Sequence, residues 1–254
     1  MAATKTAGEI LETVVIEGRD ELGRANTGLA LSALGAGLNI SFSAVVLALV
    51  GSLTGGVGLL AMAAYPLGFL IVILGKEELY TENTVTPVAV ALTDTSQITN
   101  MLRMWGILFV FNIFGAIAFA FAVTYGEILA GSGLDLLLEE VAKKMENGFW
   151  LMTLKAVFGG WLVALVAWLI AASQDTISQI FFVWLLVFAI PLGGLVHCIA
   201  GATEVLISVF VGETSWVEFL FRFLVPATLG NTIGGLVLVT LLNYGQVMGS
   251  KVRM

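Results

Sequence analysis

Two stretches of this chain resemble each other at a fixed distance along the sequence. Residues 103–115 read Arg-Met-Trp-Gly-Ile-Leu-Phe-Val-Phe-Asn-Ile-Phe-Gly, and residues 222–234 read Arg-Phe-Leu-Val-Pro-Ala-Thr-Leu-Gly-Asn-Thr-Ile-Gly. Three residue pairs recur with a spacing of 119: Arg103 and Arg222, Asn112 and Asn231, and Gly115 and Gly234. Such a duplication between apolar stretches is typical of membrane transporters and channels whose pathway lies between two repeats. For so short a match, chance is the alternative.

Composition excludes most soluble functions. Hydrophobic residues make up 59% of the 254 residues and charged residues 11%, so we do not expect a soluble globular fold. The net charge of −7 argues against nucleic-acid binding. Cys198 is the only cysteine and His197 the only histidine, which excludes an internal disulfide and the usual His/Cys metal clusters. No nucleotide-binding or catalytic-triad motif is present, so we expect no cofactor and no enzymatic activity.

Four apolar stretches are long enough to cross a membrane: 27–50, 102–126, 149–172 and 217–243. Each exceeds the ~20 residues that a helix needs to span ~30 Å of hydrocarbon. Two further stretches are interrupted. The run Lys-Glu-Glu-Leu-Tyr-Thr-Glu-Asn at 76–83 divides residues 57–95, and Pro-Leu-Gly-Gly at 191–194 divides residues 178–211.

Non-helical backbone at membrane depth is stable only where protein buries it or where it lines a wet cavity. We therefore expect the two interrupted stretches to be broken spans, the second and fifth of six, that mark the pathway. Two short hairpin spans in each stretch are the alternative.

The distribution of lysine and arginine orients the spans. One side of the membrane receives mainly Lys143 and Lys144. The other side receives Lys5, Arg19, Arg24, Arg103, Lys251 and Arg253. Because cytoplasmic loops carry an excess of such residues, both termini are expected in the cytoplasm. Arg103 and Arg222 lie near span ends, where we expect their side chains to extend to the lipid headgroups.

The predicted fold class follows from this count. With three spans in each half, the second half enters the membrane in the opposite sense. We expect an all-α membrane protein whose six transmembrane helices form a 3+3 inverted repeat with broken second and fifth spans. The expected divisions are a cytoplasmic N-terminal arm (1–26), a transmembrane channel or permease domain (27–246) and a cytoplasmic C-terminal tail (247–254).

Five short motifs in this order resemble one known family over roughly residues 27–246. They are Leu79-Tyr80-Thr81, Asn112-Ile-Phe-Gly115, Lys155 with Trp161-Leu162-Val163 and Ala167-Trp168, His197-Cys198-Ile199-Ala200, and Gly230-Asn231-Thr-Ile-Gly234-Gly235. These residues are similar to motifs of the formate/nitrite transporter family. The resemblance implies a homopentamer in the prokaryotic inner membrane, with a pore in each subunit. It also implies passage of a small monovalent anion or its conjugate weak acid, such as formate, nitrite or hydrosulfide.

The chain departs from that pattern at several positions. Gly201, Gly160 and Phe223 stand where the family usually has Asn, and Glu82 and Glu204 add carboxylates near the two breaks. We therefore expect an atypical branch. The alternatives to anion permeation are a pore for water or neutral solutes, and a non-conducting membrane scaffold or sensor.

His197 is the strongest candidate for the pathway. A lone histidine in an apolar channel can donate a hydrogen bond to a small anion or lend it a proton, although a buried neutral histidine bonded to a carbonyl is the alternative. Thr81 is its expected partner, unless it only caps the half-helix that follows. Lys155 either raises the anion concentration at the entrance or pairs with Glu204.

The remaining pathway candidates are polar residues near the breaks and apolar residues around them. Glu82 and Glu204 are expected to serve half-helix ends, or to replace the anion or bind a proton or cation. Asn112 and Asn231 are expected to tie the broken backbones to the third and sixth spans. The apolar constriction is expected around four side chains: Tyr65, Phe69, Leu79 and Ile190. Plain helix packing is the alternative for each.

Overall fold

The fold, taken from a computed structural model that describes residues 4–250, is helical, and no strand occurs among these residues. This confirms the all-α class. Four helical segments are long and apolar enough to cross a membrane. They are Asn26–Thr54, with α2 (Asn26–Ile40) and α3 (Phe42–Thr54); Thr95–Tyr125, with η2 (Thr95–Gln97) and α7 (Ile98–Tyr125); α9 (Phe149–Ala172); and Trp216–Ser250.

The segment Trp216–Ser250 is continuous but changes its helical geometry along its length. It consists of α12 (Trp216–Glu218), the π-helical η3 (Phe219–Leu224), α13 (Val225–Ile233), the π-helical η4 (Gly234–Leu241) and α14 (Leu242–Ser250). Part of the predicted tail, 251–254 with Lys251 and Arg253, lies outside the described residues, as do residues 1–3 of the predicted arm.

Shorter helices fill the two interrupted stretches. The first contains α4 (Leu59–Ala64), α5 (Leu67–Leu74), η1 (Glu82–Thr84) and α6 (Thr86–Thr93), and the second contains α10 (Thr176–Leu192) and α11 (Ala200–Phe210). Lys76 follows α5 with φ 56° and Gly194 follows α10 with φ 57°. Both residues lie in the left-handed region, which ends a helix and is unfavourable for a lysine.

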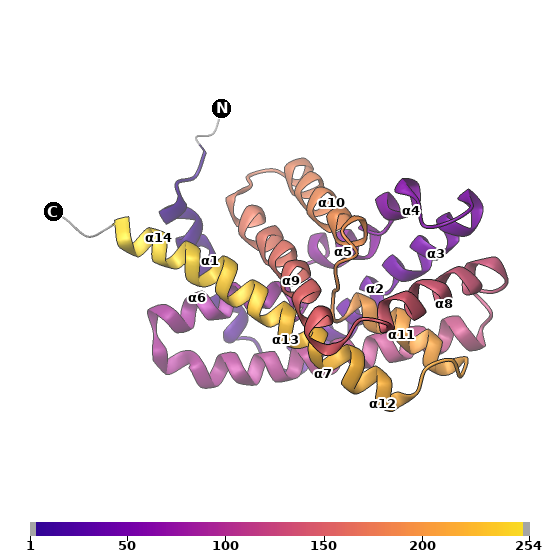
Figure 1. Ribbon diagram of the computed structural model, residues 1–254. Helices are drawn as coiled ribbons and strands as arrows, with labels where there is room; N and C mark the ends of the chain where they lie inside the picture. The colour runs from indigo at the N-terminus through magenta and orange to yellow at the C-terminus, as the bar shows by residue number, and fades with distance from the viewer. Residues whose placement is uncertain (1–3, 251–254) are drawn as a thin grey trace.

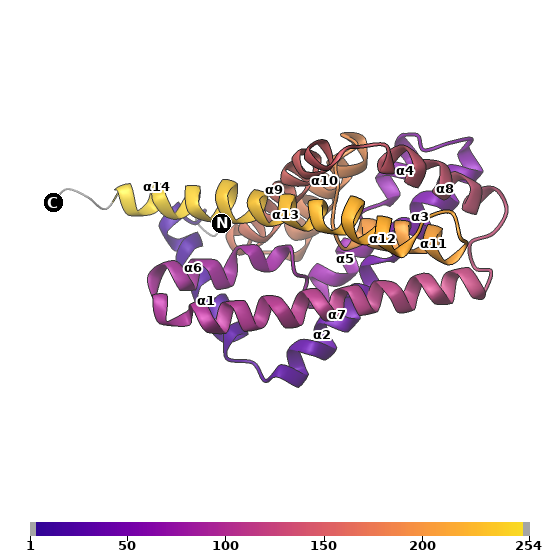
Figure 2. The same cartoon turned by 60° about the horizontal axis from the view of Figure 1, so that its bottom comes forward.

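Helix packing follows the same scheme in the two halves of the chain. α2 packs along α7, and α9 packs along α13 and η4. Figure 2 shows α2 crossing α7, and Figure 1 shows α9 meeting α13. Glycines permit the close approach, because a Cβ atom on Gly37 would overlap the backbone of Asn112 and one on Gly160 would overlap the backbone of Asn231. Small residues at helix contacts are typical of membrane proteins.

Two amphipathic helices lie outside the apolar segments. α1 (Ala7–Leu22) begins with a capping box formed by Thr6 and Glu9, and it packs against α6, α9 and α14. α8 (Ser132–Met145) packs against α3 and α11. Both views show α1 beside α6 at one end of the molecule and α8 beside α3 at the other. Each helix therefore covers one of the interrupted stretches.

Candidate functional site

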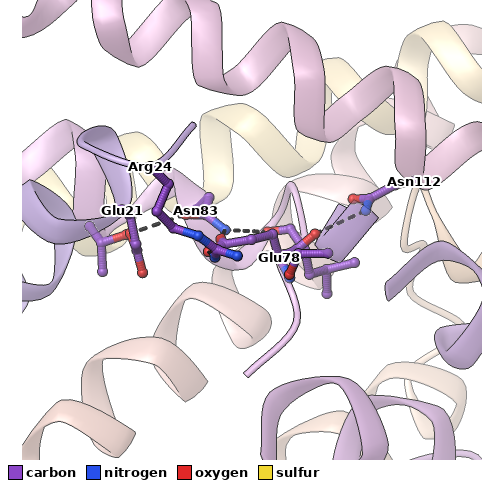
Figure 3. A network of polar contacts seen from close by, with 8 residues as sticks. Glu21, Arg24, Glu78, Asn83 and Asn112 are labelled. Carbon is purple, nitrogen blue, oxygen red and sulfur yellow. Dashed lines mark hydrogen bonds and ion pairs between the residues drawn. The ribbon is translucent and has the colours of Figure 1, made fainter. Parts of the chain in front are cut away.

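Asn112 of α7 holds the first non-helical segment, which joins α5 to η1. Its Oδ1 accepts a hydrogen bond from the backbone N–H of Tyr80 at 2.8 Å. Its Nδ2 donates to the carbonyl oxygens of Ala33 at 2.7 Å and Glu78 at 3.0 Å. Figure 3 shows the Asn112 amide directed at the Glu78 backbone. The side chain is fully buried, so its polar atoms replace backbone partners that a helix would otherwise supply.

Asn231 of α13 makes the same set of hydrogen bonds to the second non-helical segment. Its Oδ1 accepts from the backbone N–H of Cys198 at 2.8 Å. Its Nδ2 donates to the carbonyl oxygens of Ala156 at 2.6 Å and Val196 at 2.9 Å. Asn112 and Asn231 thus hold the two segments in place, and neither side chain lines the two vestibules described below.

His197 lies in the second segment and is 2% exposed. Its Nδ1 accepts a hydrogen bond from the backbone N–H of Ala200 at 3.1 Å. A neutral ring whose Nδ1 is an acceptor carries its hydrogen on Nε2. Nε2 lies 2.8 Å from Oγ1 of Thr81, and the ring packs edge-on against Phe69 with centroids 4.9 Å apart. The backbone of α11 therefore determines which nitrogen of His197 can donate.

Thr81 comes from the first segment, so the structure brings the two segments together at this contact. Its hydroxyl accepts from Nε2–H of His197 and keeps its own proton for a further acceptor. The side chain makes no capping bond to η1, so the capping role expected as an alternative is not present.

The structure contains a vestibule of about 320 Å³, here called the lysine vestibule. Tyr65 and Ile190, both expected at the constriction, line its apolar wall. Its polar lining consists of Glu140, Lys143, Lys144, Asn147, Lys155 and Glu204.

The charges of the lysine vestibule are paired differently from the sequence-based alternative. Glu204 is 5% exposed and forms an ion pair with Lys144 of α8 rather than with Lys155. Nζ of Lys155 instead donates to Oδ1 of Asn147 at 3.0 Å. Glu204 also lies a full turn inside α11, so the expected role at a half-helix end is wrong for this residue.

A second vestibule of about 320 Å³, here called the acidic vestibule, lies under α1. Its charged lining consists of Glu17, Asp20, Glu21, Arg24, Lys76, Glu77, Glu78 and Glu82. Arg24 forms an ion pair with Glu78, and Nδ2 of Asn83 donates to Oε2 of Glu78 at 2.9 Å, as Figure 3 shows. Six carboxyl groups therefore face two basic side chains.

Glu21 couples α1 to the wall of the acidic vestibule. Its Oε2 accepts a hydrogen bond from Oγ1 of Thr86 in α6. Burial, followed by the charge of Glu78, raises the pKa of Glu21 from 4.5 to about 8. Glu82 begins η1, but no hydrogen bond or ion pair to its carboxylate is present among residues 4–250.

The two vestibules are separated along the molecule. α9 contacts the lysine vestibule at Lys155 and the acidic vestibule at Ala167 and Ile170. At 1.5 Å per residue these contacts are about 20 Å apart. Four residues expected at the constriction or on the pathway are at most 2% exposed and line neither vestibule: Phe69, Leu79, Thr81 and His197.

Several of these contacts were not anticipated from the sequence. Arg103 donates to the carbonyl of Leu22, and Arg222 donates to the carbonyl of Met145, each at 2.8 Å. The two arginines therefore bind the ends of α1 and α8, where we had expected headgroup contacts. The position of Lys144 could have been predicted from the sequence. It lies three residues after buried Val141 on the amphipathic α8, and residues with this spacing share one face of a helix.

Comparison with known proteins places this arrangement in a family. A model described as "Formate/nitrite transporter" matches residues 8–245. The inner membrane protein YfdC of Escherichia coli (strain K12) is 31% identical over 243 residues, which cover 94% of this chain and 78% of that protein. A probable formate transporter of Methanothermobacter thermautotrophicus is 29% identical over 202 residues, which cover 72% of each chain.

Solved structures show the same fold. A pentameric formate channel with formate bound has a TM-score of 0.79 at 21% identity, covering 88% of this chain and 98% of that one. An ion channel described as of the FNT family has a TM-score of 0.85 at 19% identity, covering 93% of this chain and 98% of that one. The chain therefore belongs to the formate/nitrite transporter family, whose members are transporters and not enzymes.

Proposed function

We propose that this chain is a channel-like permease for small monovalent anions or their conjugate weak acids, of the formate, nitrite and hydrosulfide type. The observation that carries the proposal is the position of His197. It is buried and lines neither vestibule, and its Nε2 lies 2.8 Å from Oγ1 of Thr81, a residue from the other half of the chain. Relatives described as a probable formate transporter and a formate channel support this substrate class.

The chemistry of this contact suits a small acceptor. Moving a bare monovalent ion into a medium of low dielectric constant is strongly unfavourable unless it is hydrogen-bonded or neutralised. Nε2–H of His197 and the hydroxyl proton of Thr81 can both donate to an anion that reaches the apolar barrier of Phe69 and Leu79.

Of the two roles considered for His197, hydrogen-bond donation has the stronger support. Giving up a proton to the permeant requires an imidazolium with hydrogen on both nitrogens. A hydrogen on Nδ1 would face the N–H of Ala200, two donors in contact. We therefore infer that the neutral ring donates from Nε2 and that any proton carried across comes from the weak acid itself.

The transmembrane arrangement that we propose is the 3+3 inverted repeat with broken second and fifth spans. Four long apolar helices, together with the three shorter ones Leu59–Leu74, Thr176–Leu192 and Ala200–Phe210, support this count of spans. The matched bonds of Asn112 and Asn231, and of Arg103 and Arg222, support a relation between the halves. Similarity to a pentameric formate channel supports a homopentamer.

The proposed location is the cytoplasmic (inner) membrane of a prokaryote, with both termini in the cytoplasm. The relative YfdC is described as an inner membrane protein. The excess of basic residues on the side of the N-terminus supports the orientation. In this orientation the acidic vestibule faces the cytoplasm and the lysine vestibule faces outward.

The test is flux into proteoliposomes that contain the purified protein. Formate, nitrite and hydrosulfide gradients are applied, and vesicle volume and internal pH are followed with time. We expect at least one of these weak acids to enter faster than in empty liposomes, and His197→Phe to abolish the difference. Wild-type flux equal to that of empty liposomes would refute the proposal, and pH-independent swelling with glycerol alone would favour a neutral-solute pore.

A further inference from the structure

The ion pair between Lys144 and Glu204 lies in the wall of the lysine vestibule and is largely withdrawn from solvent. The Glu204 side chain is 7% exposed and the Lys144 side chain 19% exposed. A buried ion pair gains little net stability, because the desolvation of both charges offsets their attraction. Stability alone therefore does not account for this ion pair, which lies on the proposed path of the anion.

Tyr65 supplies an unused hydrogen-bond donor at the same place. The residue is 4% exposed and lines the lysine vestibule together with Glu204. The Tyr65 hydroxyl has no hydrogen-bond partner among residues 4–250, and it is not one of the unpartnered side-chain atoms that are withdrawn from solvent. It can therefore donate to a small acceptor that enters the vestibule.

A second ammonium group lies beside this donor. Lys155 lines the same vestibule, and its Nζ is bound to the neutral amide of Asn147. No carboxylate is paired with Lys155 within the described part of the chain. The lysine vestibule therefore holds the ammonium groups of Lys144 and Lys155 and the unpartnered hydroxyl of Tyr65, together with the carboxylate of Glu204.

We propose that Lys144 and Tyr65 form a binding site for a small carboxylate or oxyanion, and that the Glu204 side chain occupies this site as a tethered competitor. A carboxylate is the chemical equivalent of formate, with one negative charge over two oxygens. An anion that enters the vestibule exchanges with Glu204 as the acceptor for Nζ of Lys144 and accepts a second hydrogen bond from the Tyr65 hydroxyl.

This inference rests on the proposed function, because the permeant supplies the anion. Glu204 then determines specificity and concentration dependence, since only an anion abundant enough to displace a covalently attached carboxylate can bind. The acidic vestibule differs in charge, because six carboxyl groups line it against two basic side chains, and one of these, Arg24, is paired with Glu78.

The experiment measures formate binding as thermal stabilisation of the full-length protein in detergent, titrated with sodium formate at constant ionic strength. Glu204→Gln removes the competitor and leaves Lys144 free. We expect it to lower the formate concentration for half-maximal stabilisation about tenfold. Glu140→Gln is the matched control, because it also removes one carboxylate from the vestibule wall but from the partner of Lys143. It should change that concentration less than about twofold.

Two further variants test the donors. Lys144→Met in the Glu204→Gln background should restore weak binding. Tyr65→Phe, which keeps the ring and needs no change at the ion pair, should raise the half-saturating concentration several-fold even in the wild-type background. This variant keeps the inference testable if Glu204→Gln fails to fold.

The outcomes separate this site from the proposed function. An equal formate response in wild type, Glu204→Gln and Tyr65→Phe would refute the site and show that the ion pair is structural. A lower melting temperature of Glu204→Gln without formate, at an unchanged half-saturating concentration, would refute it as well. If the affinities shift as expected but the protein carries none of the tested weak acids in proteoliposomes, the permease proposal is refuted and the site is supported.

Discussion

Nε2 of His197 lies 2.8 Å from Oγ1 of Thr81, and the two side chains come from the two non-helical segments of the chain. Each segment is held by a buried asparagine that contributes one acceptor and two donor hydrogens. The geometry of the contact therefore depends on backbone positions set in both halves. Changes at the contact and changes at its supports should have separable effects on flux and stability.

At the contact itself, we expect His197→Asn to keep flux within about tenfold of wild type, because the amide supplies an N–H of similar reach. The pH profile of flux should also be kept, since a neutral donor does not titrate between about pH 5 and 8. His197→Phe should abolish flux. Proteoliposome assays from pH 5 to 8 measure all three. A profile that becomes flat in His197→Asn, in both wild-type and Glu204→Gln backgrounds, would instead indicate proton transfer by the histidine.

Loss of either supporting asparagine should destabilise the protein. Asn112→Ala removes three buried hydrogen bonds and leaves the N–H of Tyr80 and the carbonyl of Glu78 without this partner, so the free energy of unfolding should fall by about 3 kcal/mol. Asn231→Ala should have an equal effect within about 1 kcal/mol, because it removes the same three bonds. Asn100→Ala removes one exposed bond to Gln97 and is the control. The measurement is the melting temperature in detergent. Equal melting temperatures for Asn112→Ala, Asn231→Ala and Asn100→Ala would contradict this prediction.

Close helix packing should make Gly160 intolerant of substitution. A Cβ atom there would overlap the backbone of Asn231, so Gly160→Ala should destabilise the protein by about 1–3 kcal/mol or separate α9 from α13. Gly106→Ala is the matched control, because no atom lies within 4 Å of a Cβ built at Gly106. This helical position should gain up to about 1 kcal/mol from alanine. Melting temperatures that change equally in both variants would show that packing at Gly160 is not limiting.

Stability should depend on pH through Glu21. Its pKa is raised from 4.5 to about 8 in the folded protein, first by burial and then by the charge of Glu78. The folded state therefore binds more protons than the unfolded state between these values, and the free energy of unfolding falls as pH rises through this window. Glu21→Gln should remove about 2 kcal/mol of this dependence.

The control for that measurement is Glu12→Gln, an exposed position on the same helix. Melting temperatures are compared at pH 5 and pH 8. The fall between these values should be smaller in Glu21→Gln than in wild type and unchanged in Glu12→Gln. An equal fall in all three proteins would show that Glu21 does not control the pH dependence.

The helices themselves could be predicted from the sequence, because helix formation in an apolar environment depends on local composition. The four long apolar stretches contain few charges and exceed the ~20 residues needed to span the hydrocarbon, so each forms a helix long enough to cross a membrane. The motifs around Asn112, His197 and Asn231 were sufficient to indicate the family, because they are short local patterns. The polar run at 76–83 and the Pro-Leu-Gly-Gly run at 191–194 likewise marked where α5 and α10 end.

The partners of individual side chains were decided by tertiary structure. Counting residues along each span places Lys155 and Glu204 at a similar depth on the same side of the membrane. In the fold, however, α8 brings Lys144 to the Glu204 carboxylate, and Lys155 binds Asn147 instead. Arg103 and Arg222 reach the ends of α1 and α8 for the same reason. That the Tyr65 hydroxyl has no hydrogen-bond partner within residues 4–250 also depends on distant helices. Such pairings depend on helix rotation and separation, which local composition does not encode, because contacts between segments far apart in the sequence determine both.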